Sequence, residues 1–155
     1  MVIHVVNLPQ IIIDAKVRGY CTLPYPGHPR GCPMFGRRPE CPPEAPMFDE
    51  YFDMTQRFRA VVCEFDLAGH AARMKAKHPH WTQRQCCNPL YWQGSVRSQL
   101  KKTCESIRVT DEIYTLIPEA MGVDVIATMK PVGIDIVFPA YDPVRKVAIV
   151  GRTLP

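Results

Sequence analysis

A proline-rich segment that carries three cysteines, residues 19–46, constrains the fold of this chain more than any other feature. Eight of the sixteen prolines fall between Pro24 and Pro46. Each removes a backbone donor and fixes its own φ, so neither a helix nor a strand is expected from Gly19 to Pro46. Glycines at 27, 31 and 36 supply tight turns. A loop of this length is uncommon in a compact domain unless it is functional, disordered or cross-linked, and its aromatic residues and Met34 argue against disorder.

The three cysteines offer the cross-link, at the spacing Cys21-x10-Cys32-x8-Cys41. Thiolates are the soft ligands preferred by zinc and by iron–sulfur clusters. Cys32 and Cys41 each precede a proline, a step that also accompanies a cysteine ligand in bacterial ferredoxins. The chain has no C-x2-C knuckle, which most structural zinc sites use. The segment therefore favours an iron–sulfur cluster, with zinc as the alternative.

A site with four ligands needs one more donor, and the sequence leaves its identity open. Cys63 lies in an apolar run and is expected to be a buried hydrophobic residue. Cys87 and Cys104, in the predicted helical region, are the preferred candidates for a further metal ligand, and Cys86 and His28 rank below them. Three protein ligands with an open position would instead indicate chemistry at the metal.

The 155 residues fit one domain with its own core. The sequence has no apolar run of about 20 residues that would suit a membrane span. Its first ten residues lack the basic and apolar regions of a secretory signal. These features predict the cytoplasm, where cysteines remain reduced. Seven cysteines also cannot all pair within one chain, so a disulfide framework is the weaker interpretation.

Hydrophobic periodicity predicts a single α+β domain with a mixed sheet and three to four helices. Strands are expected at 2–6, 11–17, 57–65, 114–117, 134–138 and 146–150. Helices are expected at 44–54, at 67–77 behind an Asp66 N-cap, and at 119–129. A further long helix should begin at Thr82 and reach toward Ser106, with a kink or a break at Pro89.

Residues 70–108 form a basic segment with eight Lys/Arg and one acid, Glu105, which gives it a charge of +7 and leaves −3 for the rest of the chain. Trp81, Tyr91 and Trp92 are interspersed with the cations, and their rings can stack on bases. The segment predicts an anionic partner such as nucleic acid or a nucleotide. A solvated helix face, with Tyr91, Trp92 and Leu100 as its core stripe, would have the same composition. The residues expected to bind the partner are Arg84, Trp92, Arg97 and Lys101.

Two segments resemble an uncharacterised prokaryotic family of predicted metal-binding proteins. The first, GCPMFGRRPECPP, is similar to the family's Cys-Pro-aromatic-Gly and Cys-Pro-Pro elements, and the second, IPEAMGVDVIATMKPVGI, to its E-A-x-G-hydrophobic-D-V element. The resemblance implies Cys21, Cys32 and Cys41 as metal ligands and supplies no reaction. The family's later C-x2-C cluster is missing, which argues against a second metal site. The residues matched in the second segment are Glu119, Ala120, Gly122, Asp124, Val125, Thr128 and Gly133.

Three functions remain open. The first is an iron–sulfur protein, of the 4Fe–4S type, with redox or sulfur-handling chemistry on a nucleotide or RNA. The second is a structural zinc module that binds nucleic acid, and the third is a metal-free interaction protein with ordinary thiols. No catalytic residue is identified, because the sequence has no phosphate-binding glycine loop, H-E-x-x-H or G-x-S-x-G motif. The cysteine loop favours the first function.

Overall fold

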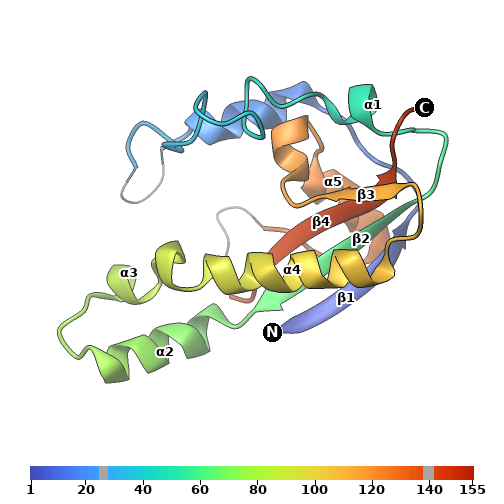
Figure 1. Cartoon of the computed structure of the whole chain (residues 1–155). Helices are drawn as coiled ribbons and strands as arrows, with labels where there is room; N and C mark the ends of the chain where they lie inside the picture. The colour runs from blue at the N-terminus through green and yellow to red at the C-terminus, as the bar shows by residue number, and fades with distance from the viewer. Residues whose placement is uncertain (25–27, 138–141) are drawn as a thin grey trace.

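The computed structural model describes residues 1–24, 28–137 and 142–155. Its sheet has the strand order β1-β2-β4-β3, in which every pair of neighbours is antiparallel (Figure 1). The α+β class is therefore confirmed, whereas the predicted mixed sheet is wrong. The strands are β1 (Val2–Leu8), β2 (Phe58–Phe65), β3 (Glu112–Thr115) and β4 (Val144–Arg152).

Five α-helices and four 3-10 helices occur in the described part of the chain. The α-helices are α1 (Phe48–Tyr51), α2 (Leu67–Lys77), α3 (Gln83–Cys86), α4 (Gln93–Ile107) and α5 (Val125–Met129). The 3-10 helices are η1 (Ala15–Thr22), η2 (Pro89–Tyr91), η3 (Pro118–Met121) and η4 (Lys130–Val132).

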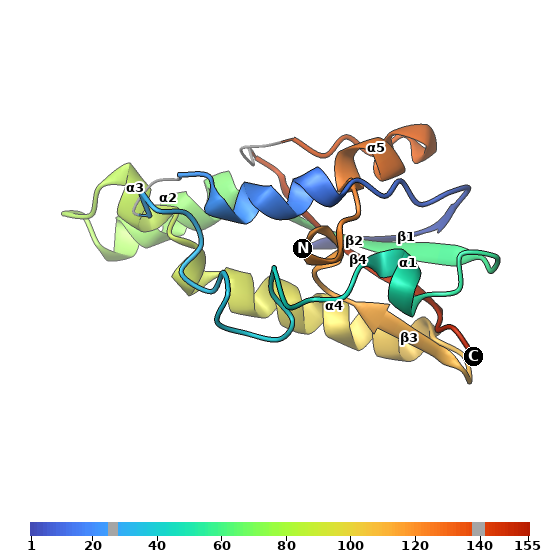
Figure 2. The same ribbon diagram turned by 90° about the horizontal axis from the view of Figure 1, so that it is seen from above.

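The sheet is apolar on both faces and separates two cores, because successive side chains of a strand point to opposite faces. In β2, Ala60 and Val62 face one core, whereas Val61 and Cys63 face the other. The first core is completed by α1, α5 and residues of the β1–η1 connection, and the second by α4. Figures 1 and 2 show α4 on one side of the sheet and α1 with α5 on the other.

Helices α2 and α3 extend beyond the end of the sheet at which β2 finishes (Figures 1 and 2). Asp66 caps α2, which ends before His78-Pro79, and both predictions are confirmed. Thr82 caps α3. The long helix predicted after Thr82 is split at Pro89, as the sequence allowed, because proline cannot donate to the helical ladder. Regular α-helix resumes only at Gln93.

The predicted strand at 11–17 is wrong. Ile13 makes a single isolated bridge to Val123. The next residue, Asp14, then accepts a hydrogen bond from the backbone N of Lys16 at 2.9 Å and caps η1. Because η1 continues to Thr22, the predicted irregular segment from Gly19 begins with helical residues.

Other predicted elements differ in length. The helix expected at 44–54 is reduced to the single turn of α1, because Asp53 N then donates to Arg152 O at 2.9 Å and draws the chain to the sheet. The helix expected at 119–129 is broken at Gly122, whose φ of +81° lies in the left-handed region. Residues 134–137 form no strand, and Phe138 lies outside the described residues. The first, third and last predicted strands are confirmed, and β3 begins two residues earlier than expected.

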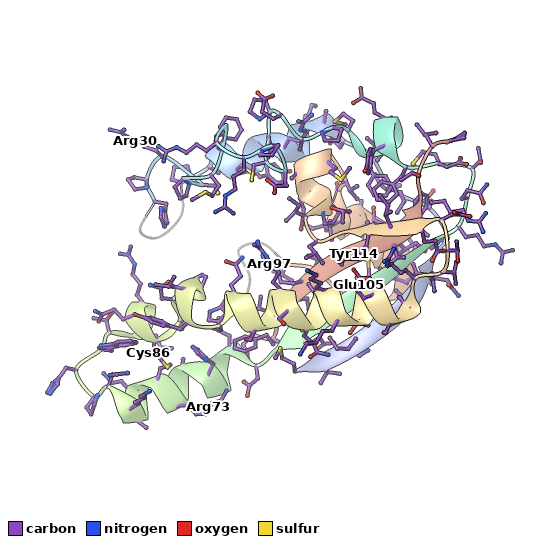
Figure 3. The ribbon with its side chains drawn as sticks, viewed as in Figure 1. Arg30, Arg73, Cys86, Arg97, Glu105 and Tyr114 are labelled. Carbon is purple, nitrogen blue, oxygen red and sulfur yellow. The ribbon has the colours of Figure 1, made fainter. Side chains whose placement is uncertain are left out.

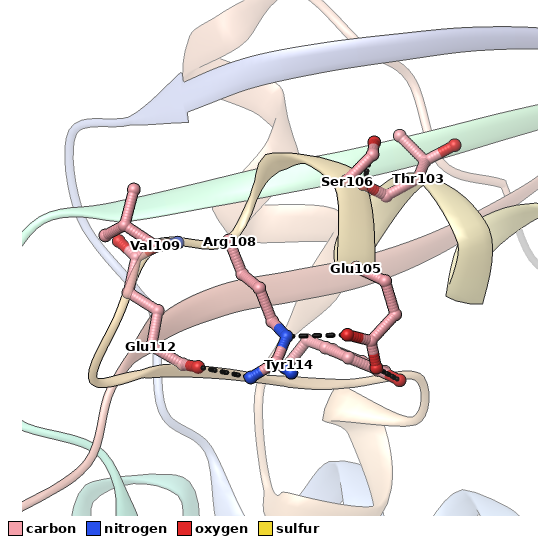
Figure 4. A network of polar contacts seen from close by, with 7 residues as sticks. All are labelled: Thr103, Glu105, Ser106, Arg108, Val109, Glu112 and Tyr114. Atoms are coloured by element: carbon pink, nitrogen blue, oxygen red, sulfur yellow. Dashed lines mark hydrogen bonds and ion pairs between the residues drawn. The ribbon is translucent and has the colours of Figure 1, made fainter.

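A polar network closes the connection from α4 to β3 (Figure 4). Glu105 accepts hydrogen bonds from the Tyr114 hydroxyl at 2.7 Å and from Arg108 Nε at 2.6 Å. Arg108 Nη1 donates to the backbone oxygen of Glu112 at 3.2 Å, and the Glu112 carboxylate pairs with Arg59 of β2. These contacts fix the short edge strand β3 against the end of α4.

Candidate metal centre

Helix η1 carries Cys21 near its C-terminal end and connects the cysteine loop, residues 19–46, to the folded domain. Its first turn is attached to the folded core. Ile13 pairs with Val123, and Asp14 N donates to Gly122 O at 2.8 Å. The antiparallel bridge places η1 alongside η3, and the two helices pack together. Cys21 is therefore held in a fixed relation to the rest of the domain.

Cys32 is attached to Cys21 through the backbone. Cys32 N donates to Cys21 O at 2.7 Å. The preceding residue, Gly31, has a φ of +83°, and a Cβ added there would lie 2.5 Å from Cys21 O and 2.7 Å from backbone atoms of Thr22. Only glycine permits this approach. The sequence predicted a turn at Gly31, but it gave no sign of the close contact.

Arg18 attaches the Cys41 end of the loop to the same helix. Its guanidinium donates to the carbonyl oxygens of Pro43 at 2.7 Å and Ala45 at 2.6 Å. Ala45 N in turn donates to Cys41 O at 3.0 Å. Arg18 precedes Cys21 by three residues, so both side chains lie on one face of a helix with three residues per turn. Sequence reasoning missed Arg18, because no spacing pattern marks an arginine that binds distant carbonyls.

The three loop thiols and Glu119 form one electrostatic group. Burial raises the pKa of the Cys21 thiol, and the charges of Cys32, Cys41 and Glu119 raise it further. The three cysteines are half-buried and free. Glu119 stands on η3 and keeps access to solvent, while desolvation by the surrounding protein raises the pKa of its carboxyl against the opposing charge of Lys146. Three thiols and a carboxylate are donors that fit zinc or an iron–sulfur cluster.

The side chains are not already gathered around one point. Among the described residues, no three His, Cys, Asp or Glu groups lie close enough together to hold a metal ion. Metal binding is coupled to the folding of the segment that carries the ligands, because a formed site rarely exists in an unfolded chain. A metal bound here would have to draw the loop thiols together.

The structure places the other candidate ligands on other elements. Cys104 is fully buried between α4 and the sheet, where burial raises the pKa of its thiol to about 11. Cys87 is half-buried at the end of α3. Cys63 is buried in the sheet, as predicted, Cys86 is also buried, and His28 is exposed in the loop. Cys104 therefore contributes to the core beneath α4.

The predicted anion-binding residues divide between surface and core. Arg84, Arg97 and Lys101 are exposed, and Figure 3 shows Arg97 pointing from α4 toward the side of the molecule on which the cysteine loop lies. Trp92 is instead buried. Its ring stacks on Phe65 with centroids 4.9 Å apart, and its Nε1 donates to the backbone oxygen of Cys87 at 3.1 Å. The expectation that the Trp92 ring contacts a partner is wrong, because this ring fills the core at the start of α4.

Comparisons of this chain with protein-family models, with curated proteins and with solved structures gave no significant match. Within the described ranges, no helix has the length and apolar character needed to cross a membrane. The resemblance to the metal-binding family, carried by one segment in the cysteine loop and one in the C-terminal part of the chain, stays a prediction. A function for this chain is therefore inferred from the geometry of the cysteine loop and of the basic segment.

Proposed function

We propose that this chain is a small metal-binding protein that holds an iron–sulfur cluster through Cys21, Cys32 and Cys41. The observation that carries the proposal is the attachment of all three to one helix, η1. Cys21 lies within η1, Cys32 is bonded to the backbone of Cys21, and Arg18 binds the carbonyls that follow Cys41. The proline-rich loop contributes few residues to the two cores, and a metal would supply its missing cross-link.

A cluster at this position would supply redox or sulfur-handling chemistry, with thiolates as its protein ligands. The chain's own contribution is to position the three thiols and to place an acid beside them. Glu119 is that acid, since its charge acts directly on Cys21.

Anaerobic purification followed by iron, sulfide and zinc analysis tests the proposal. We expect iron and acid-labile sulfide in the wild-type protein, with broad visible absorption, and their loss in Cys32→Ser. Cys63→Ala is the matched control, because Cys63 is buried in the sheet and away from solvent. Its metal content should equal that of the wild type.

Two other outcomes decide between the alternatives. Zinc without sulfide, lost in Cys32→Ser, would replace the cluster with a structural zinc ion at the same ligands. A protein that contains no metal after anaerobic purification, or keeps all of it in Cys32→Ser, would refute the ligand assignment and favour a metal-free interaction protein.

We further infer that the basic segment, residues 70–108, receives nucleic acid or a nucleotide on which this chemistry acts. From Leu67 to Cys104 the chain has seven Lys/Arg and no Asp or Glu. In the described part of the chain, none of these seven cations forms a salt bridge. A polyanion would supply the missing countercharge. Arg97 faces the side of the cysteine loop (Figure 3), so Arg97→Gln should weaken the binding of such a partner.

A further inference from the structure

Three rings stack on the arm formed by α2, α3 and η2, and we call them the aromatic platform: His78, Trp81 and Tyr91. The His78 and Trp81 rings are nearly parallel, with centroids 4.1 Å apart and an angle of 12° between planes. The Trp81 and Tyr91 rings follow at 5.2 Å and 32°. None of the three belongs to either core. The stack is therefore not explained by packing of the domain interior.

One ring of the platform, Tyr91, is exposed to solvent, and the other two, His78 and Trp81, are half-buried. Tyr91 is 49% exposed, and the neighbouring Leu90 is 79% exposed, the highest value among the large exposed hydrophobic residues of the described chain. The next residue, Trp92, is buried. Two adjacent aromatic residues thus have opposite environments, and only Trp92 serves the fold. Exposed apolar groups gathered in this way mark binding surfaces more often than stability devices.

Local hydrogen bonds hold the platform in place. Lys75 Nζ donates to the Trp81 carbonyl at 2.6 Å, which ties the end of α2 to the platform. The Asn88 side chain accepts from Leu90 N at 3.0 Å and caps η2, which carries Tyr91. The rings are therefore arranged before any partner binds, and a partner has less conformational entropy to remove.

The stretch of sequence that carries the platform has only cationic and neutral side chains. Lys77 ends α2 one residue before His78, and Arg84 lies on α3. The stretch has no carboxylate between Asp66 and Glu105. Figure 3 shows a further cation on α2, Arg73, and another on α4, Arg97.

We propose that the aromatic platform binds single-stranded nucleic acid. Unpaired bases stack on exposed rings, and the strand's phosphates meet the surrounding cations. In a duplex the faces of the bases are covered by their neighbours, so the rings could not reach them. The proposal rests on the inferred anionic partner of the basic segment and names its class. It does not depend on the identity of the metal.

Fluorescence anisotropy with a labelled single strand of about 12 nucleotides, within the range that stacking proteins cover, tests the platform. RNA, DNA of the same sequence and the matching duplex are compared over a series of salt concentrations. We expect Tyr91→Ala to weaken binding of the single strand by about 5- to 150-fold, the effect of losing one stacking ring. Tyr91→Phe keeps the ring and should bind as the wild type does.

A second pair of variants tests how much the cations contribute to binding of the strand. Arg84→Gln should lower the affinity and reduce the slope of log Kd against log salt by about 0.7, the value for one phosphate contact on a single strand. Arg57→Gln is the matched control. Arg57 precedes the first residue of β2, whereas the arm follows its last residue, so the two lie at opposite ends of the strand. Arg57→Gln should leave binding unchanged.

The outcomes separate this proposal from the metal site. Equal affinity for duplex and single strand, or no change in Tyr91→Ala with unchanged circular dichroism, would overturn the platform. Tighter binding of RNA than of DNA would identify RNA as the ligand, and equal binding would support single strands of either kind. Because Cys32→Ser leaves the platform intact, it should bind the strand even after losing its metal. Failure of one proposal is thus visible without failure of the other.

Discussion

Replacing Gly31 with alanine should disrupt metal binding without removing a ligand. Gly31 has a φ of +83°, where an alanine costs about 1–2 kcal/mol. Its Cβ would lie 2.5 Å from Cys21 O, so the backbone must move and the 2.7 Å hydrogen bond from Cys32 N to Cys21 O is lost. That bond is worth about 0.5–1.5 kcal/mol. Together the two effects amount to about 1.5–3.5 kcal/mol, or about a 10- to 300-fold loss of affinity.

The assay is iron and sulfide content after anaerobic purification, followed by the rate of metal loss to a chelator. Gly19→Ala is the matched control in the same loop, because an added Cβ there meets nothing within 4 Å. It should retain metal like the wild type. Circular dichroism should be unchanged in both variants, since neither glycine lies in a core.

If Gly31→Ala keeps the metal content and chelator resistance of the wild type, the reasoning is refuted. Metal binding would then not require the hydrogen bond from Cys32 N to Cys21 O. Equal loss of metal in Gly19→Ala would also contradict it. That result would show a loop sensitive to any substitution.

Three further predictions concern the sheet and α4. Glu112→Ala should lower the free energy of unfolding by about 1–3 kcal/mol in chemical denaturation, because the partly buried Arg59 loses its carboxylate partner and keeps its bond to Ile107 O; an unchanged midpoint would contradict this. Stability should fall as pH rises from 9 toward 11, by up to about 3 kcal/mol, because burial raises the Cys104 pKa from 9.0 to about 11 and only the unfolded chain loses the proton. Cys104→Ala should flatten that slope. Tyr114 should ionise near pH 12 in ultraviolet titration, because its hydrogen bond to Glu105 raises its pKa to about 12, and Glu105→Gln should bring the ionisation lower.

Local signals predicted much of the secondary structure. The Asp66 cap and the His78-Pro79 stop define α2, and Pro89 divides the helical region as expected. Residues 11–17 failed because β-branched side chains suit a strand only when a partner strand is available. Ile13 finds only the isolated bridge to Val123.

The candidate site could be predicted in part. Cys21, Cys32 and Cys41 were identified from residue type and from their prolines, because ligand chemistry depends on the side chain itself. Trp92 was assigned to a partner although it belongs to the core. The four-residue spacing of Trp92 with the buried Val96, Leu100 and Cys104 of α4 is the signal that marks Trp92 as a core ring, and the assignment to a partner overlooked it.

By itself the sequence predicted little regular structure in the proline-rich segment, since proline removes the donors of helices and strands, and it predicted the three cysteines as candidate ligands. It also determined the cationic stretch without carboxylates. Only the tertiary structure showed that η1 binds both parts of the loop, through the hydrogen bonds of Arg18 and through the close approach of Gly31 to Cys21. Those contacts join residues distant in the chain, and their geometry depends on backbone positions that no local pattern encodes.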